Sequence, residues 1–142
     1  MPTDDTKRRT VRSFVRRAGR LTDSQKRALD DLAPVYLVDY SANRLLFPEI
    51  FGRDAPVVLE IGFGNGETLV EQAEQNPDRN FVGIEVHEPG VGHCLLKAEA
   101  TGIENLRIIM HDAVEVLANQ VSPASLHRIN LYFPDPWPKK RH

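Results

Sequence analysis

A ten-residue stretch, 57–66 with the sequence VVLEIGFGNG, most constrains what this chain can fold into. It begins as an apolar, β-branched run of strand length and ends with glycines at every second position, Gly62, Gly64 and Gly66. The residues that follow, 67–75, are typical of a helix. A strand, a glycine turn and a helix in succession bring the backbone close to a nucleotide-like ligand. The stretch therefore predicts a binding turn at the end of a strand.

The chain from residue 56 onward alternates strand patterns with helix patterns. The predicted strands are 57–61, 80–86, 106–110 and 128–133, and the predicted helices are 67–75, 89–100 and 113–119. Such alternation favours right-handed βαβ units and a parallel sheet. We therefore expect an α/β fold with an open, Rossmann-like parallel sheet, of which this sequence supplies four strands.

The part of the chain before the first strand divides by charge. Residues 1–20 hold seven Lys and Arg against two Asp, although the whole chain has a net charge of −2. This basic N-terminal arm suggests contact with a polyanion, and the alternative is a solvated tail. An N-terminal helical segment follows over 21–52. In it the sequence from Thr22 to Gln25 is a capping-box pattern that predicts a helix start, and Pro34 predicts the end of that helix.

Composition narrows the class of protein. Hydrophobic residues make up 41% of the chain and charged residues 27%, as in ordinary globular domains. No apolar run is long enough to cross a bilayer, and the N-terminus lacks the apolar core of a secretory signal. The single cysteine, Cys94, fits a reducing compartment, and the five histidines show no metal-ligand spacing. We expect a cytoplasmic protein without membrane contact or a metal.

Acidic residues recur where the predicted strands end. They are Glu60, Glu85, Asp112 and Asp135, at intervals of 23 to 27 residues, or about one strand–helix unit. Ligands of open α/β sheets bind beyond the carboxyl ends of the strands, so the four carboxylates would converge on one crevice. The alternative is that these residues are helix N-caps, which suits Asp112 best.

The carboxylates discriminate between ligands. They would oppose the pyrophosphate of a dinucleotide, whereas S-adenosyl-L-methionine carries a sulfonium, an ammonium and one carboxylate, and no phosphate. The glycine pattern agrees, because the dinucleotide fingerprint has Gly or Ala where this sequence has Glu67. Glu85 lies 19 residues after Gly66, placed to accept hydrogen bonds from both ribose hydroxyls. Asp112 or its neighbours would then recognise the adenine amino group.

The fourth predicted strand runs into a stiff loop, residues 133–138 with the sequence FPDPWP. The loop would fix Asp135 and Trp137 at the mouth of the crevice, and the basic run Lys139-Lys140-Arg141 follows it. An aromatic face can stack a base, worth roughly 1–3 kcal/mol, and the cations can hold phosphates. The loop therefore favours a nucleic-acid substrate. The alternative is a surface turn with Trp137 in the core.

At these motifs the chain resembles a known family. The segments LEIGFGNG, GIEVH, HDA and FPDPW are similar to successive motifs of the bacterial tRNA (guanine-N7-)-methyltransferases, and SFVRRAGR is similar to their N-terminal signature. The segments lie at 59–66, 83–87, 111–113, 133–137 and 13–20. The resemblance runs from about residue 12 to the last residue. It implies the Rossmann-like open parallel sheet of class I methyltransferases, with 53–142 as the N-terminal portion of the methyltransferase domain.

The resemblance also implies a reaction, the transfer of a methyl group from S-adenosyl-L-methionine to N7 of a guanine in tRNA. The expected acceptor is the variable-loop guanosine at position 46 of the tRNA. The implied cofactor contacts are Glu60, Glu85, Asp112 and Asp135, beside the turn of Gly62, Gly64 and Gly66. Asp135 is also the implied catalytic residue, and Lys139 the implied tRNA contact. From the residue chemistry, Lys140, Arg141 and Trp137 are further candidates for substrate binding.

The chemistry of the acceptor gives Asp135 a role. Guanine N7 carries a lone pair and no proton, so attack on the methyl group requires no general base. In-line positioning helps, and so does stabilisation of the positive charge that develops on the purine. A carboxylate at Asp135 has the right sign for that, and it could also accept a hydrogen bond from the guanine.

The sequence departs from the family in one respect, because the family's domain continues through further strands. Here the fourth strand would be left as an open edge, and exposed edges favour association. We therefore expect the 142-residue chain alone to be poorly stable, self-associating or inactive.

Three alternatives stay open: a nucleic-acid methyltransferase acting on an exocyclic amine, a dinucleotide-dependent oxidoreductase, and a non-catalytic remnant that binds tRNA or nothing.

Overall fold

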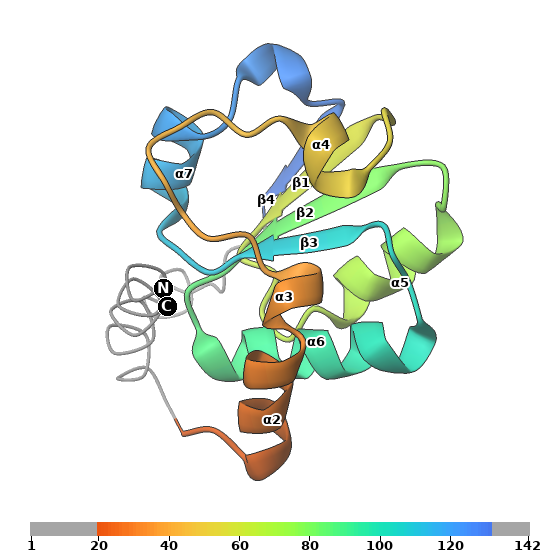
Figure 1. Cartoon of the computed structure of the whole chain (residues 1–142), viewed down its shortest axis with the longest axis vertical. Coiled ribbons are helices and arrows are strands. Elements are labelled where there is room, and N and C mark those ends of the chain that lie inside the picture. The colour runs from red at the N-terminus through yellow and green to blue at the C-terminus, as the bar shows by residue number, and fades with distance from the viewer. Residues whose placement is uncertain (1–19, 132–142) are drawn as a thin grey trace, which may run out of the picture.

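The computed structural model describes residues 20–131 and contains one parallel sheet with helices on both faces (Figure 1). The strand order is β3-β2-β1-β4. The elements are α2 (Asp23–Asp31), α3 (Ala33–Tyr36), α4 (Phe47–Phe51), β1 (Val57–Ile61), α5 (Glu67–Gln75), β2 (Asn80–Ile84), α6 (Glu88–Thr101), β3 (Leu106–Ile109), α7 (Ala113–Asn119), the short 3-10 helix η1 (Pro123–Ser125) and β4 (Arg128–Leu131). The predicted α/β parallel sheet is confirmed.

Strand β2, which follows α5, ends earlier than predicted. β2 stops at Ile84, two residues short of the expected end. The reason is the side chain of Glu85, whose Oε2 accepts hydrogen bonds from the backbone N–H groups of Val86 and His87. These donors are therefore no longer directed to a neighbouring strand. Residues 132 and 133 of the fourth predicted strand lie outside the described residues.

The two faces of the sheet have separate apolar layers. Helices α2, α5 and α6 cover one face, where Val58 packs with Leu69 and Leu95. Helices α4 and α7 cover the other face, where Leu59 packs with Phe47 and Val116. Successive residues of a strand point to opposite faces, so Glu60 shares the face of Val58. No helix of the described residues is long and apolar enough to cross a membrane.

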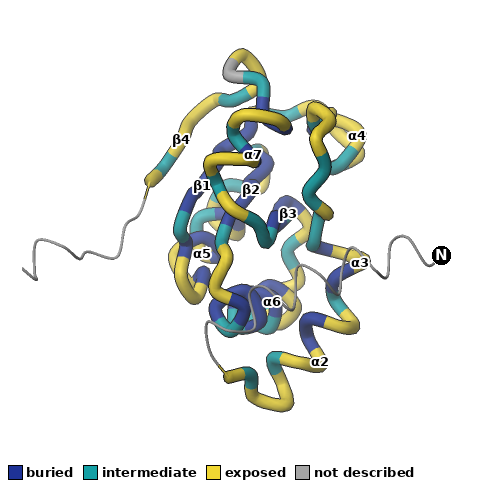
Figure 2. Tube along the Cα trace, turned by 90° about the vertical axis from the view of Figure 1, so that its left-hand side faces the viewer, coloured by how far each residue is buried: buried dark blue, intermediate teal, exposed yellow. Residues whose placement is uncertain are grey.

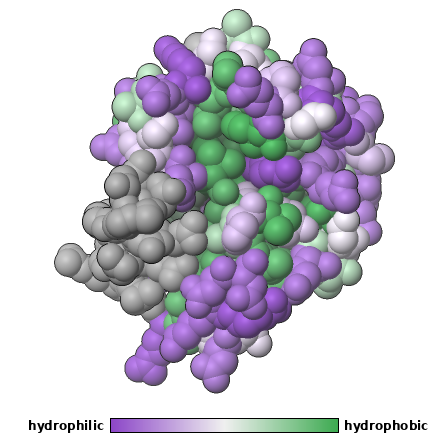
Figure 3. Space-filling view, in the orientation of Figure 1, coloured by the Kyte–Doolittle hydropathy of each residue, from purple (hydrophilic) through white to green (hydrophobic). Residues whose placement is uncertain are grey.

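The two edges of the sheet differ. The segment after α3 covers the β3 edge, since Leu37 bridges Ile108 in parallel and the Val38 N–H donates to the Ile108 carbonyl at 2.8 Å. Figure 3, seen from this side, shows a central band of apolar side chains between hydrophilic flanks. β4 pairs with β1 and is largely exposed along its length (Figure 2), with Ile129 at 50% and Leu131 at 54%. In residues 20–131 its outer edge has no partner strand.

The N-terminal helical segment begins as predicted but ends differently. The capping box is present, with the Gln25 N–H donating to Thr22 Oγ1 at 3.1 Å and the Thr22 N–H donating to Gln25 Oε1 at 3.0 Å. The prediction that Pro34 ends this helix was wrong, because α2 ends at Asp31. Pro34 lies in the first turn of α3, where a missing N–H leaves no hydrogen bond unmade.

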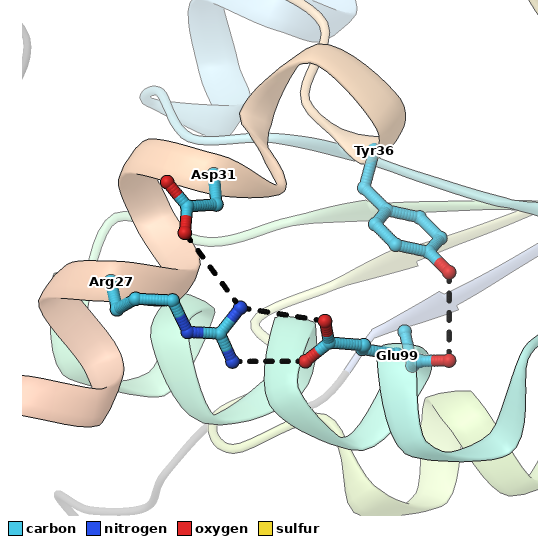
Figure 4. Close-up of polar contacts among 5 residues, drawn as sticks. Arg27, Asp31, Tyr36 and Glu99 are labelled. Carbon is cyan, nitrogen blue, oxygen red and sulfur yellow. Dashed lines mark hydrogen bonds and ion pairs between the residues drawn. The ribbon is translucent and has the colours of Figure 1, made fainter.

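Polar contacts fasten α2 and α3 to α6 (Figure 4). The guanidinium of Arg27 donates to both carboxylate oxygens of Glu99, at 3.0 and 3.4 Å, and lies 4.0 Å from Asp31. The Tyr36 hydroxyl lies 3.5 Å from the Ala98 carbonyl of α6, and it donates to the carbonyl of Ile103, just beyond α6, at 2.8 Å. Arg27 and Glu99 are each 45% exposed, whereas Tyr36 is buried. The ion pair is therefore open to solvent screening, and the Tyr36 contact is not.

Two substitutions distinguish these contacts. Tyr36→Phe should lower the free energy of unfolding by about 1 kcal/mol at any salt concentration, because it leaves a part-buried carbonyl without its donor. Arg27→Ala should lower the free energy of unfolding slightly at low salt and hardly at all in 1 M NaCl, because solvent and salt screen the exposed ion pair. Urea unfolding at both salt concentrations measures the two effects. An equal salt dependence for the two variants would contradict this assignment.

Candidate methyl-donor site

The glycine turn between β1 and α5 requires its glycines. Gly62, Gly64 and Gly66 have φ values of 76, 66 and 78°, in the left-handed region that side chains with a Cβ disfavour. The Gly62 N–H donates to the Ile84 carbonyl at 2.8 Å, which ties the turn to β2. Gly66 is the N-cap of α5. The predicted strand–turn–helix unit is therefore present, at the carboxyl end of the sheet.

Helix α6 packs directly on this turn. A Cβ added to Gly90 would clash with the Gly64 carbonyl, and one added to Gly66 would clash with the Cys94 side chain. A Cβ added to Gly64 meets nothing within 4 Å, so the outer side of the turn is open. Sequence reasoning missed the approach of α6. The feature that could have predicted this close approach is the pair of glycines at 90 and 92, since glycine is otherwise unfavourable inside a helix.

Glu85 connects the turn to the start of α6. Its Oε1 accepts from the Gly64 N–H at 2.7 Å, and its Oε2 accepts from the N–H groups of Val86 and His87 at 3.2 and 3.1 Å. A carboxylate offers about four acceptor positions, so these three bonds leave capacity for another donor. The structure thus brings Glu85 to the glycine turn, and it adds a role in holding the turn that the sequence pattern had not indicated.

Glu60 lies inside the sheet rather than beyond its edge. It is 1% exposed and stands in register between Gly83 of β2 and Asn130 of β4. Within residues 20–131 its Oε1 has no hydrogen-bond partner. Burial raises the pKa of Glu60 to about 7, against the opposing effect of a hydrogen bond with Asn130. Burial, with Glu60 nearby, likewise raises the pKa of the Cys94 thiol to about 12.

Asn130 was not among the predicted site residues. The sequence does show a polar side chain in the interior of the fourth strand, but only the strand register places Asn130 beside Glu60. Paired residues of neighbouring strands point to the same face, so the two side chains are adjacent. Glu88, fully buried in the first turn of α6, is a second carboxyl group that the pattern search passed over.

Asp112 is the N-cap of α7. Its Oδ2 accepts from the Glu115 N–H at 3.2 Å, which is the helix-cap alternative in its usual geometry. Beside it, the His111 ring stacks on the Tyr40 ring with centroids 3.9 Å apart, and His111 Nε2 also contacts a Glu115 carboxylate oxygen. Cap and cofactor contact are compatible, because the exposed carboxylate retains free acceptor positions. Its role in cofactor binding stays a prediction.

The second half of the predicted site lies outside the described residues. This holds for Asp135, Trp137 and the basic run 139–141. The structure therefore bears on the turn, Glu60, Glu85 and Asp112 alone.

The comparison with protein families decides the class. A family model described as "Putative methyltransferase" matches residues 54–142. The chain belongs to this methyltransferase family. A dinucleotide-dependent oxidoreductase is thereby set aside. That the turn between β1 and α5 holds the methyl donor stays a prediction of the sequence resemblance.

The chain is also similar to curated relatives named tRNA (guanine-N(7)-)-methyltransferase. It is 59% identical to that of Cronobacter sakazakii, 57% to that of Yersinia enterocolitica and 54% to that of Vibrio cholerae. Each match extends over 134 residues, or 94% of this chain and 56% of the relative. The chain thus spans about half the length of the curated relatives it matches.

One solved structure supports the fold. It is titled "Structure of an Antibiotic Related Methyltransferase" and superposes with a TM-score of 0.50 at 19% sequence identity. The match covers 72% of this chain and 52% of the other. At this identity the likeness concerns the fold and not the substrate.

The packing of α6 on the turn gives a matched pair of variants. Gly64→Ala should cost about 1–2 kcal/mol, since it adds left-handed backbone strain in open space. Gly66→Ala adds the same strain and a clash with Cys94, which should cost a further 1–3 kcal/mol or so. Thermal unfolding of both variants measures the difference. Equal destabilisation would show that α6 does not restrain the turn.

Proposed function

We propose that this chain forms the methyl-donor half of an enzyme that methylates N7 of guanine in tRNA. The observation that carries the proposal is the open glycine turn, with the Glu85 carboxylate bonded across it and Glu60 buried beneath. Relatives that bear this enzyme's name match 94% of the chain at more than half of the aligned positions. These two facts together support the proposal that this chain contributes to the same activity.

The residues of the turn fit S-adenosyl-L-methionine. A buried carboxyl oxygen without a hydrogen-bond partner in residues 20–131 suits a cationic donor, and the cofactor carries two cations. Glu85 has acceptor capacity left for the ribose hydroxyls. The backbone outside Gly64 leaves room for close approach of a ligand. When bound, the cofactor supplies an electrophilic methyl group.

In this proposal the predicted site residues have separate roles. Glu85 holds the turn and accepts from the ribose, and Asp112 or its neighbours orient the adenine. Asp135 stabilises the purine cation and positions the guanine. Trp137 stacks the base, and the basic run 139–141 holds the tRNA phosphates.

The wider setting follows from the same proposal. The polyanion that the basic N-terminal arm of residues 1–20 suggests is the tRNA substrate, and the protein acts in the cytoplasm. Residues 53–142 correspond to the N-terminal portion of a methyltransferase domain, preceded by the helical segment 21–52. A non-catalytic role in tRNA binding is the second candidate, which the assays below distinguish from the first.

Methylation assays test the reaction. The 142-residue chain and a version extended with the C-terminal portion of a relative are compared for tRNA methylation, with the modified atom mapped by nucleoside mass spectrometry. The extended version should form N7-methylguanine, and its Asp135→Asn variant should lose roughly 10²-fold or more in kcat, because the charge is removed at constant size. Normal turnover by Asp135→Asn would refute the role of this carboxylate. Methylation of an exocyclic amine would refute the reaction, and tRNA binding without transfer would favour the second candidate.

The exposed strand predicts self-association. We propose that the 142-residue chain associates through the outer edge of β4, where Ile129 and Leu131 are half exposed. Leu131→Lys should shift sedimentation velocity profiles toward monomer, since a charge at the edge opposes strand pairing. Val35→Lys is the control, because Val35 is equally exposed at 54% but lies on α3. A wild-type chain that is monomeric at all concentrations would contradict this proposal.

A further inference from the structure

Glu60 is enclosed on the sides that the structure describes. Gly83 and Asn130 flank it in the sheet, and it faces the layer of α5 and α6. Its exposed fraction is 1%, and its Oε1 has no partner in residues 20–131. A charged carboxylate is poorly solvated in such a place, whereas the neutral acid is tolerated.

The groups that face Glu60 from the neighbouring elements do not neutralise it. Asn130 on β4 offers a neutral amide, and Gly83 on β2 has no side chain. Cys94 on α6 stays a neutral thiol, since its pKa is raised to about 12. Burial, the larger of two causes, raises the pKa of Glu60 to about 7, and no cation within residues 20–131 contributes. The carboxylate of Glu85 is bonded to backbone amides of the turn.

We propose that binding of S-adenosyl-L-methionine is coupled to the loss of a proton from Glu60. Without the cofactor and below pH 7, the Glu60 carboxyl group holds its proton. When the ammonium group at the amino-acid end of the cofactor binds beside it, the O–H bond breaks, the proton passes to solvent, and the carboxylate remains paired with the cation. The inference rests on the proposed function, and it adds a dependence on pH that the methyl-transfer reaction does not itself require.

The coupling has a definite direction. Below pH 7 the ligand competes with a proton, so its affinity should fall about tenfold for each pH unit. Above pH 7 the affinity should be level until the ammonium group of the ligand itself begins to lose its proton, at about pH 8 or higher. The ammonium group is also present in S-adenosylhomocysteine, which lacks the sulfonium, so this product should show the same coupling. The fragment 5′-methylthioadenosine lacks the amino-acid end and should show none.

Calorimetry measures the proton directly. Titration with S-adenosylhomocysteine, in pairs of buffers that differ in ionisation enthalpy, should show release of close to one proton at pH 6 and a release that declines as the pH rises past 7. The variant Glu60→Gln should bind without proton release and with an affinity that no longer changes with pH. The control is His93→Gln, which removes the imidazole that lies against Glu67, and this variant should keep the proton release.

A measurement without ligand tests Glu60 by itself. A carboxyl group whose pKa is raised from 4.5 to about 7 in the folded protein stabilises the fold fully below pH 4.5, and that stabilisation is lost as the pH rises through 7. The urea midpoint of the wild type should therefore fall relative to that of Glu60→Gln between pH 5 and 8. A difference that does not change with pH would overturn the inference.

The outcomes separate the inference from the function on which it rests. Binding of S-adenosylhomocysteine with no proton exchange, or with exchange that persists in Glu60→Gln, overturns the inference and leaves the proposed function intact. Failure of S-adenosylhomocysteine to bind in any buffer, by either the 142-residue or the extended chain, overturns the proposed function and the inference with it. Binding with release that Glu60→Gln abolishes supports both.

Discussion

The hydrogen bond from the Gly64 N–H to the Glu85 carboxylate is the contact on which the arrangement of the site depends. It joins a turn in left-handed backbone geometry to the strand beside it, at 2.7 Å. The second oxygen of the same carboxylate receives the N–H groups of Val86 and His87 at the start of α6. The Glu85 side chain therefore accepts hydrogen bonds at the end of β2, just before α6 and in the glycine turn, and so holds these three segments together. The shape of the site is set by the apoprotein, so the ligand need not order it.

Helix α6 makes this arrangement rigid from the other side. Gly90 and Gly66 bring helix and turn so close that neither position has space for a methyl group. The same helix binds α2 through the ion pair of Arg27 and Glu99. The side chain of Gln25 packs closely against Gly92. Glycines in α6 weaken its intrinsic helix propensity, but they allow it to contact two elements at once. The N-terminal helices are in this way part of the frame that holds the turn.

The elements that the sequence predicted well are those fixed by local patterns. The glycine turn, the helices over 67–75 and 113–119, and the capping box depend on neighbours within a few residues, and they have the predicted bounds. The failures came from a side-chain role and a helix junction that the strand and helix patterns do not show. The Glu85 side chain shortens β2, and a second helix takes Pro34 into its first turn. The burial of Glu60 depends on strand register and on Cys94, 34 residues away, which no local pattern encodes.

The contrast between the two sheet edges has a consequence for the order in which the molecule is made. The β3 edge is sealed by residues 37 and 38, which precede every strand in the sequence. A ribosome therefore delivers the cover of this edge before the strand that needs it. β4, the last strand described, has no partner strand on its outer edge within residues 20–131. In these residues the open side of the sheet is therefore the side whose strand is made last.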